Sequence, residues 1–184
     1  MLSILIPTYN NFDYFKLCIK SLETNTDNKY EIIVHVNDGI DGTLDFVKNK
    51  SFKYIHSKTN IGLCSSINKI AKISNYKYLL YSHDDMFFCP GWDSALINEI
   101  KKIGHNNFYL SGTMIEPNSG HIKFNAGKDF NSFNEQKLLD NINNLNFFDH
   151  QGSHFAPHLV HKDLWNCLLY TSDAADDSLR VDLG

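Results

Sequence analysis

Residues Tyr78 to Asp85 read Tyr-Leu-Leu-Tyr-Ser-His-Asp-Asp, an aromatic and aliphatic run that stops on an imidazole and two carboxylates. Carboxylates inside a sheet are costly unless they are paired or bind a metal. At the carboxyl end of a parallel strand, however, they stand where open α/β sheets bind ligands. Because side chains alternate along a strand, we expect His83 and Asp85 on one face and Asp84 on the other. Taken alone, the acidic pair also fits a solvated loop after an edge strand.

Strands and helices alternate on both sides of this stretch. Apolar and β-branched runs predict strands over residues 2–6, 30–36, 52–56, 78–81 and 108–115. Apolar residues at helical spacing predict helices between them, the first capped by Asp13, and one more helix over 134–145. The alternation predicts an α/β domain whose mostly parallel central sheet is flanked by helices.

Three of the predicted strands end in polar segments. The first is followed by Pro-Thr-Tyr-Asn at 7–10, the second by Asn-Asp-Gly at 37–39, and the fourth by His-Asp-Asp at 83–85. The carboxyl ends of strands in one parallel sheet lie on one rim, so we expect these segments to converge. Each segment alone has an ordinary explanation, such as a plain turn at 38–39. Their joint order indicates a ligand site.

In this order the segments resemble those of inverting family 2 glycosyltransferases, which have the GT-A fold. The first strand of that family ends in Pro-x-Tyr-Asn, as residues 7–10 do here. Its Asn-x-Gly segment, which opens a helix, is matched by residues 60–62. Its metal-binding Asp-x-Asp region, with a proline several residues later, is matched by 83–85 and Pro90. The resemblance covers roughly residues 2–168.

Three positions depart from the family pattern. The second strand of the family typically ends in Asp-Asp-Gly-Ser, whereas Asn37 replaces the first Asp here and Ile40 replaces the Ser. His83 stands where the first Asp of Asp-x-Asp is often found. All three departures fall inside the predicted site.

The resemblance implies a Rossmann-like GT-A domain over residues 1–168, with an insertion at about 118–149. Its activity would be the inverting transfer of a sugar from a nucleotide-sugar donor to an acceptor hydroxyl of a glycan, lipid or protein. The donor-binding residues would be Pro7, Thr8, Tyr9, Asn10, Asp38, Asn60, Gly62 and Asp84.

Individual roles also follow from the resemblance. Tyr9 would stack on a uracil-like base whose N–H donates to Asp38, and Asp84 would bond ribose or sugar hydroxyls. Asp85 would bind the cofactor, Mg²⁺ or Mn²⁺, which bridges the diphosphate oxygens, with His83 as a softer or outer ligand. We therefore expect Tyr9, Asp38, Asp84 and Asp85 to cluster at one rim. The donor is most simply UDP-linked, with GDP and dTDP donors open.

Residues 169–184 differ in composition from the rest of the chain. They are acidic, rich in small residues and free of asparagine, so we expect a non-native or disordered tail such as translated sequencing adaptor. A genuine acidic tail is the alternative. The family places its catalytic base, an Asp or Glu, just after a helix like 160–168, so we expect this chain to lack its base. Asp173, Asp176 and Asp177 are not assigned that role.

Composition limits which classes of partner and which cellular setting we expect. The net charge of −4 gives no support for a nucleic-acid partner. The four cysteines form no Cys-x-x-Cys pair, which favours a reduced, intracellular setting. The apolar run before Pro7 is too short for a signal peptide or a membrane span. We therefore expect a cytoplasmic protein, with peripheral attachment at the inner membrane face left open.

Two other interpretations of the site remain open. A sugar-phosphate nucleotidyltransferase shares the sheet type, but the Gly-rich, Arg-containing loop expected near its first strand does not follow Ile6. A non-catalytic nucleotide-sugar binding module is the second alternative.

The late histidines His150, His154, His158 and His161 raise the question of a zinc site. Pro157 argues against one helix carrying both His154 and His158. Contact of one of these histidines with the donor metal or phosphates is the interpretation we prefer.

Overall fold

The computed structural model describes residues 1–118, 120–145 and 156–172. The strands are β1 (Leu2–Tyr9), β2 (Tyr30–Asn37), β3 (Lys53–Ser57), β4 (Tyr78–Tyr81), β5 (Tyr109–Ser111), β6 (Ile115–Glu116), β7 (Ile122–Lys123) and β8 (His158–His161). The helices are α1 (Phe12–Asn25), α2 (Thr43–Asn49), α3 (Leu63–Lys72), α4 (Trp92–Ile103), α5 (Glu135–Asn141), the 3₁₀ turn η1 (Ile142–Asn144) and α6 (Lys162–Ser172). None of the helices described has the length and apolar character needed to cross a membrane.

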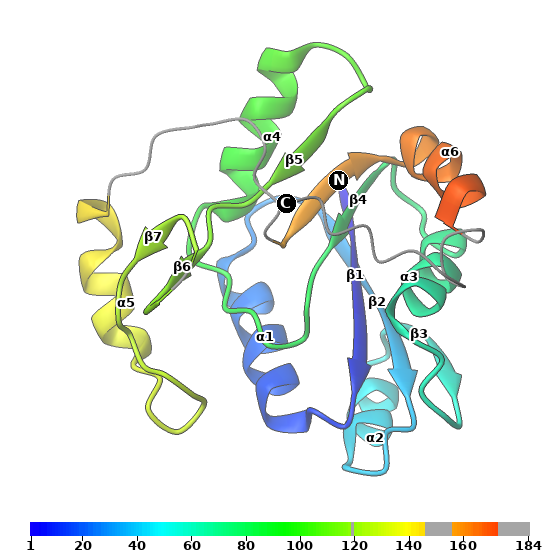
Figure 1. The fold of residues 1–184 in the computed structure, drawn as a ribbon, viewed down its shortest axis with the longest axis horizontal. Coiled ribbons are helices and arrows are strands. Elements are labelled where there is room, and N and C mark those ends of the chain that lie inside the picture. Colours follow the sequence, from blue (N-terminus) through cyan, green and yellow to red (C-terminus); the bar gives the residue numbers. More distant parts are fainter. Residues whose placement is uncertain (119, 146–155, 173–184) are drawn as a thin grey trace.

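The main sheet has six strands in the order β3-β2-β1-β4-β8-β5 (Figure 1). The pairs β1–β2, β1–β4 and β2–β3 are parallel, whereas β8 runs antiparallel to both β4 and β5. The predicted mostly parallel α/β sheet is confirmed. The alternation of elements did not predict that β8 would return between β4 and β5.

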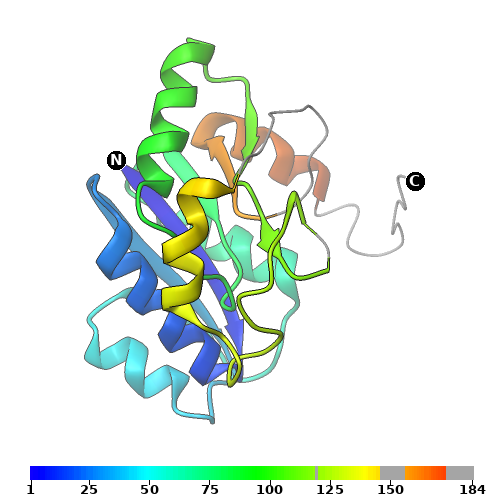
Figure 2. The same cartoon turned by 90° about the vertical axis from the view of Figure 1, so that its left-hand side faces the viewer.

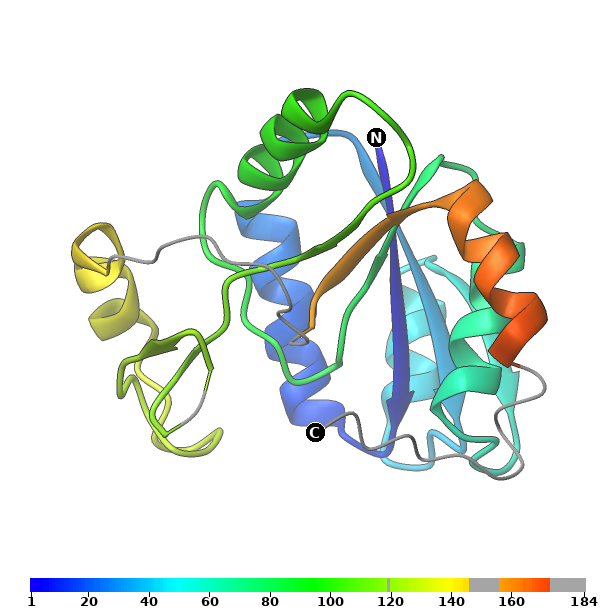
Figure 3. The same cartoon turned by 45° about the horizontal axis from the view of Figure 1, so that its top comes forward.

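Helices cover both faces of this sheet, which is why β1 and β2 are buried along most of their length. On one face, α1, α2 and α4 pack on Leu2, Ile4 and Ile6 of β1 (Figures 1 and 2). On the other face, α3 and α6 pack on Leu5 and its neighbours (Figure 3). β1 is buried from its first residue to Thr8, and only its last residue, Tyr9, is exposed. The strand therefore leads from the core directly to the rim.

Two element boundaries differ from the sequence predictions. The first helix begins at Phe12 with Asn11 as its N-cap residue, so Asp13 lies in the first turn and is not the cap. The strand predicted over 108–115 is broken, because β5 ends at Ser111 and β6 begins at Ile115. Gly112 lies at the break: its N–H donates to the carbonyl of Pro157 at 2.9 Å, and a Cβ there would lie 3.0 Å from the proline ring.

The inserted segment contains β7 and α5, and β7 pairs with β6, which lies just before the segment. These three elements lie apart from the main sheet (Figure 1). Aromatic contacts join the inserted segment to the rest of the domain: the rings of Phe130 and Tyr14 are 5.4 Å apart, and those of Phe133 and Phe87 are 5.2 Å apart. Two other aromatic residues of the segment, Phe147 and Phe148, lie outside the described residues. Helix α6 runs to Ser172, four residues past the predicted domain boundary. Residues 173–184 also lie outside the described ranges, so the interpretation of the tail stays a prediction.

Acid should destabilise the fold through His35, which is fully buried on β2. Burial lowers the pKa of His35 from 6.5 to about 4, and the nearby cations Lys69 and His56 act in the same direction. Since the folded-state pKa lies below the unfolded value, stability is lost as the pH falls from about 6.5 towards 4. We expect urea unfolding to show a loss on the order of 2 kcal/mol across this window. His35→Leu should reduce that loss, whereas the control His105→Gln, at an exposed site, should retain it.

Candidate functional site

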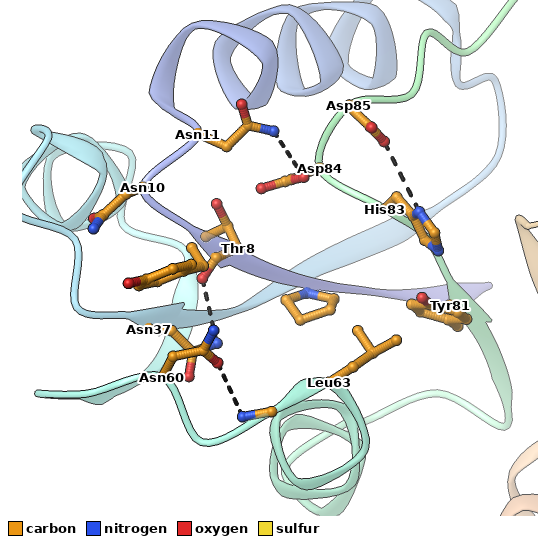
Figure 4. A pocket seen from close by; sticks show the side chains of 13 residues that line it. Thr8, Asn10, Asn11, Asn37, Asn60, Leu63, Tyr81, His83, Asp84 and Asp85 are labelled. Carbon is orange, nitrogen blue, oxygen red and sulfur yellow. Dashed lines mark hydrogen bonds and ion pairs between the residues drawn. The ribbon is translucent and has the colours of Figure 1, made fainter. Parts of the chain in front are cut away.

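A cavity of about 350 Å³ lies at the carboxyl ends of β1, β2 and β4 (Figure 4). It is lined by Pro7, Thr8, Tyr9, Asn10, Asn11, Asn37, Asn60, Gly62, Leu63, Tyr81, His83, Asp84 and Asp85. All three predicted polar segments and the Asn-x-Gly segment therefore meet at one rim. Of the residues expected to bind donor or metal, Asp38 alone does not line this cavity.

The His-Asp-Asp segment follows β4 and is not part of it, since the strand ends at Tyr81. His83 Nδ1 lies 4.0 Å from Asp85 Oδ1, whereas Asp84 Oδ1 accepts a hydrogen bond from Asn11 Nδ2 at 3.1 Å. The pairing of His83 with Asp85 agrees with the prediction. The separation onto two sheet faces does not, because the three residues lie beyond the strand and face the same cavity (Figure 4).

Asp84 is the electrostatically strained member of the site. Burial raises its pKa above the ordinary value, and the carboxylate of Asp85 raises it further. The hydrogen bond from Asn11 and the nearby hydroxyl of Thr8 oppose this rise. No lysine or arginine is among the described residues that line the cavity. The site therefore holds two neighbouring carboxylates and, among its described lining residues, neither a lysine nor an arginine.

Asp38 sits beside the cavity and is joined to it through Asn10. Asn10 Nδ2 donates to Asp38 Oδ2 at 3.0 Å, and Asn10 Oδ1 accepts from the N–H of Gly39 at 3.0 Å. Asn10 and Asp38 have φ values of 46° and 61°, a left-handed conformation that these residue types tolerate better than most. Tyr9 presents an exposed ring at the same rim, 52% accessible. Tyr9, Asp84 and Asp85 thus share one cavity, with Asp38 at its margin.

Asn11 and Cys18 lie at the site but were not expected there from the sequence. Asn11 was not singled out, although it directly follows the Pro-x-Tyr-Asn segment, and its contact with Asp84 joins residues far apart in the chain. Cys18, buried on α1, directs its Sγ to the carbonyl oxygen of His83 at 3.7 Å. Burial raises the pKa of this thiol well above its usual range, so it remains protonated and packs beneath the acidic segment.

A larger cavity of about 1330 Å³ meets the first one at His83 and Asp85, which line both. Its other walls come from α4, the β6–β7 pair, α5 and the loop after β4. They are mainly apolar, with Phe87, Trp92 and Phe133 among them. The acidic segment therefore forms the boundary between a polar and an apolar compartment.

The described residues contain no group of three or more His, Cys, Asp or Glu side chains placed to hold a metal by themselves. His158 Nδ1 lies 3.1 Å from Ser111 Oγ, and His161 Nδ1 lies 3.4 Å from Asp163 Oδ2. His150 and His154 lie outside the described residues. A metal at the acidic segment would therefore need ligand oxygens from a bound molecule.

Comparison with known proteins identifies the family. The family model described as Glycosyl transferase family 2 matches residues 3–164. The chain belongs to this family. The match covers nearly the whole range of the resemblance seen in the sequence. Membership of this family favours a glycosyltransferase over a sugar-phosphate nucleotidyltransferase.

Curated relatives of this family 2 chain include uncharacterized glycosyltransferases. One from Rickettsia bellii is 34% identical over 117 residues, which are 60% of this chain and 16% of the relative. YibD of Escherichia coli is 33% identical over 89 residues, 46% of this chain and 26% of the relative. The chain thus spans well under half the length of these relatives.

Solved structures confirm the GT-A-like fold. The S. aureus TarS 1–349 structure in complex with UDP-GlcNAc has a TM-score of 0.64 at 17% identity, covering 91% of this chain and 47% of TarS 1–349. The mannosyltransferase PcManGT from Pyrobaculum calidifontis, in complex with GDP-Man and Mn²⁺, has a TM-score of 0.53 at 14% identity, covering 63% of this chain and 36% of PcManGT. At these identities the likeness shows the fold alone.

Proposed function

We propose that this family 2 chain binds a nucleotide-sugar, most simply UDP-linked, together with Mg²⁺ or Mn²⁺, and serves transfer of the sugar to an acceptor hydroxyl. One observation carries the proposal: Tyr9, Asp84 and Asp85 share a rim cavity, with Asp38 bonded to its edge through Asn10. The TarS structure in complex with UDP-GlcNAc supports the choice of donor class.

The base and sugar of the donor would be held at opposite ends of the cavity. The exposed ring of Tyr9 offers a stacking surface for a base. Asp38 has one carboxylate oxygen bonded to Asn10, which fixes its orientation while the other oxygen accepts from the base N–H. Asp84, held by Asn11, would accept hydrogen bonds from ribose or sugar hydroxyls. The two carboxylates, Asp38 and Asp84, are each already restrained by an asparagine side chain.

The acidic segment fits a hard divalent cation. Asp85 and His83 lie 4.0 Å apart and are about half exposed, so both can turn towards a shared ligand. The repulsion between Asp84 and Asp85, and the lack of lysine and arginine among the described lining residues, favour a cation wherever a diphosphate is to bind. When bound, the cation would supply neutralisation of the diphosphate as charge develops on it. PcManGT in complex with GDP-Man and Mn²⁺ supports this assignment.

We further propose that the acceptor reaches the donor through the larger cavity. His83 and Asp85 line both compartments, so a hydroxyl entering from the apolar side would meet the sugar at the acidic segment. Inverting transfer needs a base on the acceptor side. We assign none of the described carboxylates to that role, and Asp173, Asp176 and Asp177 lie outside the described residues.

Calorimetric titration with UDP, GDP, dTDP and ADP in the presence of Mn²⁺ tests the proposed function. We expect UDP to bind most tightly. Tyr9→Ala should weaken UDP binding about tenfold, since stacking of a base on an aromatic ring contributes about 1–3 kcal/mol. The control Tyr54→Ala removes another exposed tyrosine, on the edge strand β3, and should leave the affinity unchanged. If the wild-type chain binds no nucleotide, the proposal is wrong.

A further inference from the structure

Asn37, one of the three departures from the family pattern, lies at the centre of a hydrogen-bond circuit beneath the cavity. It is the last residue of β2, and only 4% of it is exposed. Its Oδ1 accepts from the backbone N–H of Ile61 at 3.0 Å, and its Nδ2 donates to Ser66 Oγ at 3.1 Å. The amide therefore uses both its acceptor and its donor.

Ser66 closes the circuit. It is fully buried on α3, and its Oγ donates to the carbonyl of Gly62 at 2.6 Å. Because a hydroxyl carries one proton, the proton in the Asn37–Ser66 contact comes from the amide. Both branches of the circuit thus end on residues 60–62. Asn60 and Gly62 line the cavity, so their placement sets the shape of its wall.

A carboxylate at position 37 would not complete this circuit. Asn37 Nδ2 also faces the carbonyl oxygen of Thr8 at 3.4 Å, and a carboxylate oxygen there would repel it. The carboxylate would also compete with the Gly62 carbonyl for the single proton of Ser66. A buried charge without a cationic partner is costly in addition. The neutral amide satisfies every one of these contacts.

We propose that Asn37 is a positioning residue for the donor: through Ile61 and Ser66 it fixes residues 60–62 against the end of β1. Ser66 is a second positioning residue in the same hydrogen-bond circuit. The inference rests on the proposed function, because UDP is the ligand whose binding it names. It also explains why this chain departs from the aspartate that is typical of the family.

Three variants test the inference. Ser66→Ala removes the link to Gly62, and Asn37→Asp replaces the amide by a carboxylate. Ser74→Ala is a matched control, since Ser74 is buried just beyond the other end of α3 and donates to the carbonyl of Ala71 at 2.6 Å. We expect Ser66→Ala to weaken UDP binding in Mn²⁺ about fivefold, the value of one net hydrogen bond. Ser74→Ala should lower the melting temperature about as much as Ser66→Ala does, and it should leave the UDP affinity unchanged.

The pH profile separates positioning from a merely structural role. The UDP affinity of Asn37→Asp, taken as a ratio to wild type at each pH, should be about tenfold low at pH 8 and recover towards pH 5.5. Protonation lets the buried carboxyl group donate a hydrogen bond again. A ratio that does not change with pH, or equal UDP affinities for Ser66→Ala and Ser74→Ala, would overturn the inference. If Asn37→Asp does not fold, Ser66→Ala carries the test.

Amide hydrogen exchange distinguishes this inference from the proposed function. The Ile61 N–H should exchange severalfold faster in Ser66→Ala than in Ser74→Ala, with no ligand present. Failure of the wild-type chain to bind UDP would overturn the proposed function, whereas faster Ile61 exchange would still support the positioning of residues 60–62. Equal Ile61 exchange in the two variants would show that the circuit does not hold this segment.

Discussion

Asp85→Asn should abolish the part of UDP binding that depends on Mn²⁺. Wild-type chain is expected to bind UDP about 10–100-fold more tightly with Mn²⁺ than with a chelator, and the variant should bind equally weakly under both conditions. The physical reason is that an amide lacks the charge that a hard cation requires, while the diphosphate still meets the carboxylate of Asp84. The fold should be unaffected, because Asp85 is exposed in the loop that follows β4.

Calorimetry with and without chelator measures this difference directly. Asp27→Asn is the matched control. It removes one exposed carboxylate just before β2, at the opposite end of the strands from the cavity. That variant should retain the full metal dependence. A wild-type chain with equal UDP affinity in Mn²⁺ and in chelator would refute the assignment of Asp85, and a variant that keeps the metal dependence would do the same.

The convergence of the site was predictable because it follows from the sheet. β1, β2 and β4 are apolar runs covered by helices on both faces, so their ends are visible in the sequence. Once these strands are parallel and adjacent, the segments that follow them must meet at one rim. The cavity that contains Tyr9, Asp84 and Asp85 is the result.

The parts that could not be predicted depend on contacts between distant segments. β8 enters the sheet between β4 and β5 as an antiparallel strand, and local periodicity carries no information about such a partner. The strand expected over 108–115 ends at Ser111, next to the close approach of Gly112 to Pro157, a contact between segments far apart in the chain. Likewise, the proposed role of Asn37 depends on Ser66, which lies on a later helix. Residue patterns predicted which segments line the cavity, but the geometry within it required the tertiary structure.

The same dependence on tertiary contacts makes Asp84 a residue at which the proposed donor binding would oppose stability. Burial and the neighbouring Asp85 raise the pKa of the Asp84 carboxyl group, so its charged form destabilises the folded chain. Because the folded-state pKa lies above the unfolded value, this cost is present at pH 7 and is relieved as the pH falls through the folded pKa. The pH dependence of this contribution to stability is opposite in sign to that of His35. Variants at Asp84 and at His35 therefore separate the two contributions.

Asp84→Asn should therefore stabilise the fold while weakening donor binding. The amide keeps an oxygen that can accept from Asn11 but removes the charge, so we expect the melting temperature at pH 7 to rise by a few degrees, with a gain of about 1 kcal/mol. The gain should shrink as the pH falls, because the wild-type carboxylate then becomes neutral as well. UDP-sugar affinity should fall about tenfold, since a neutral acceptor bonds hydroxyls more weakly than a carboxylate. Thermal melts at pH 7 and pH 4.5, paired with calorimetry, measure both effects. A lower melting temperature at pH 7, or unchanged affinity for a UDP-sugar, would contradict the assignment of Asp84 as a strained residue kept for the ligand.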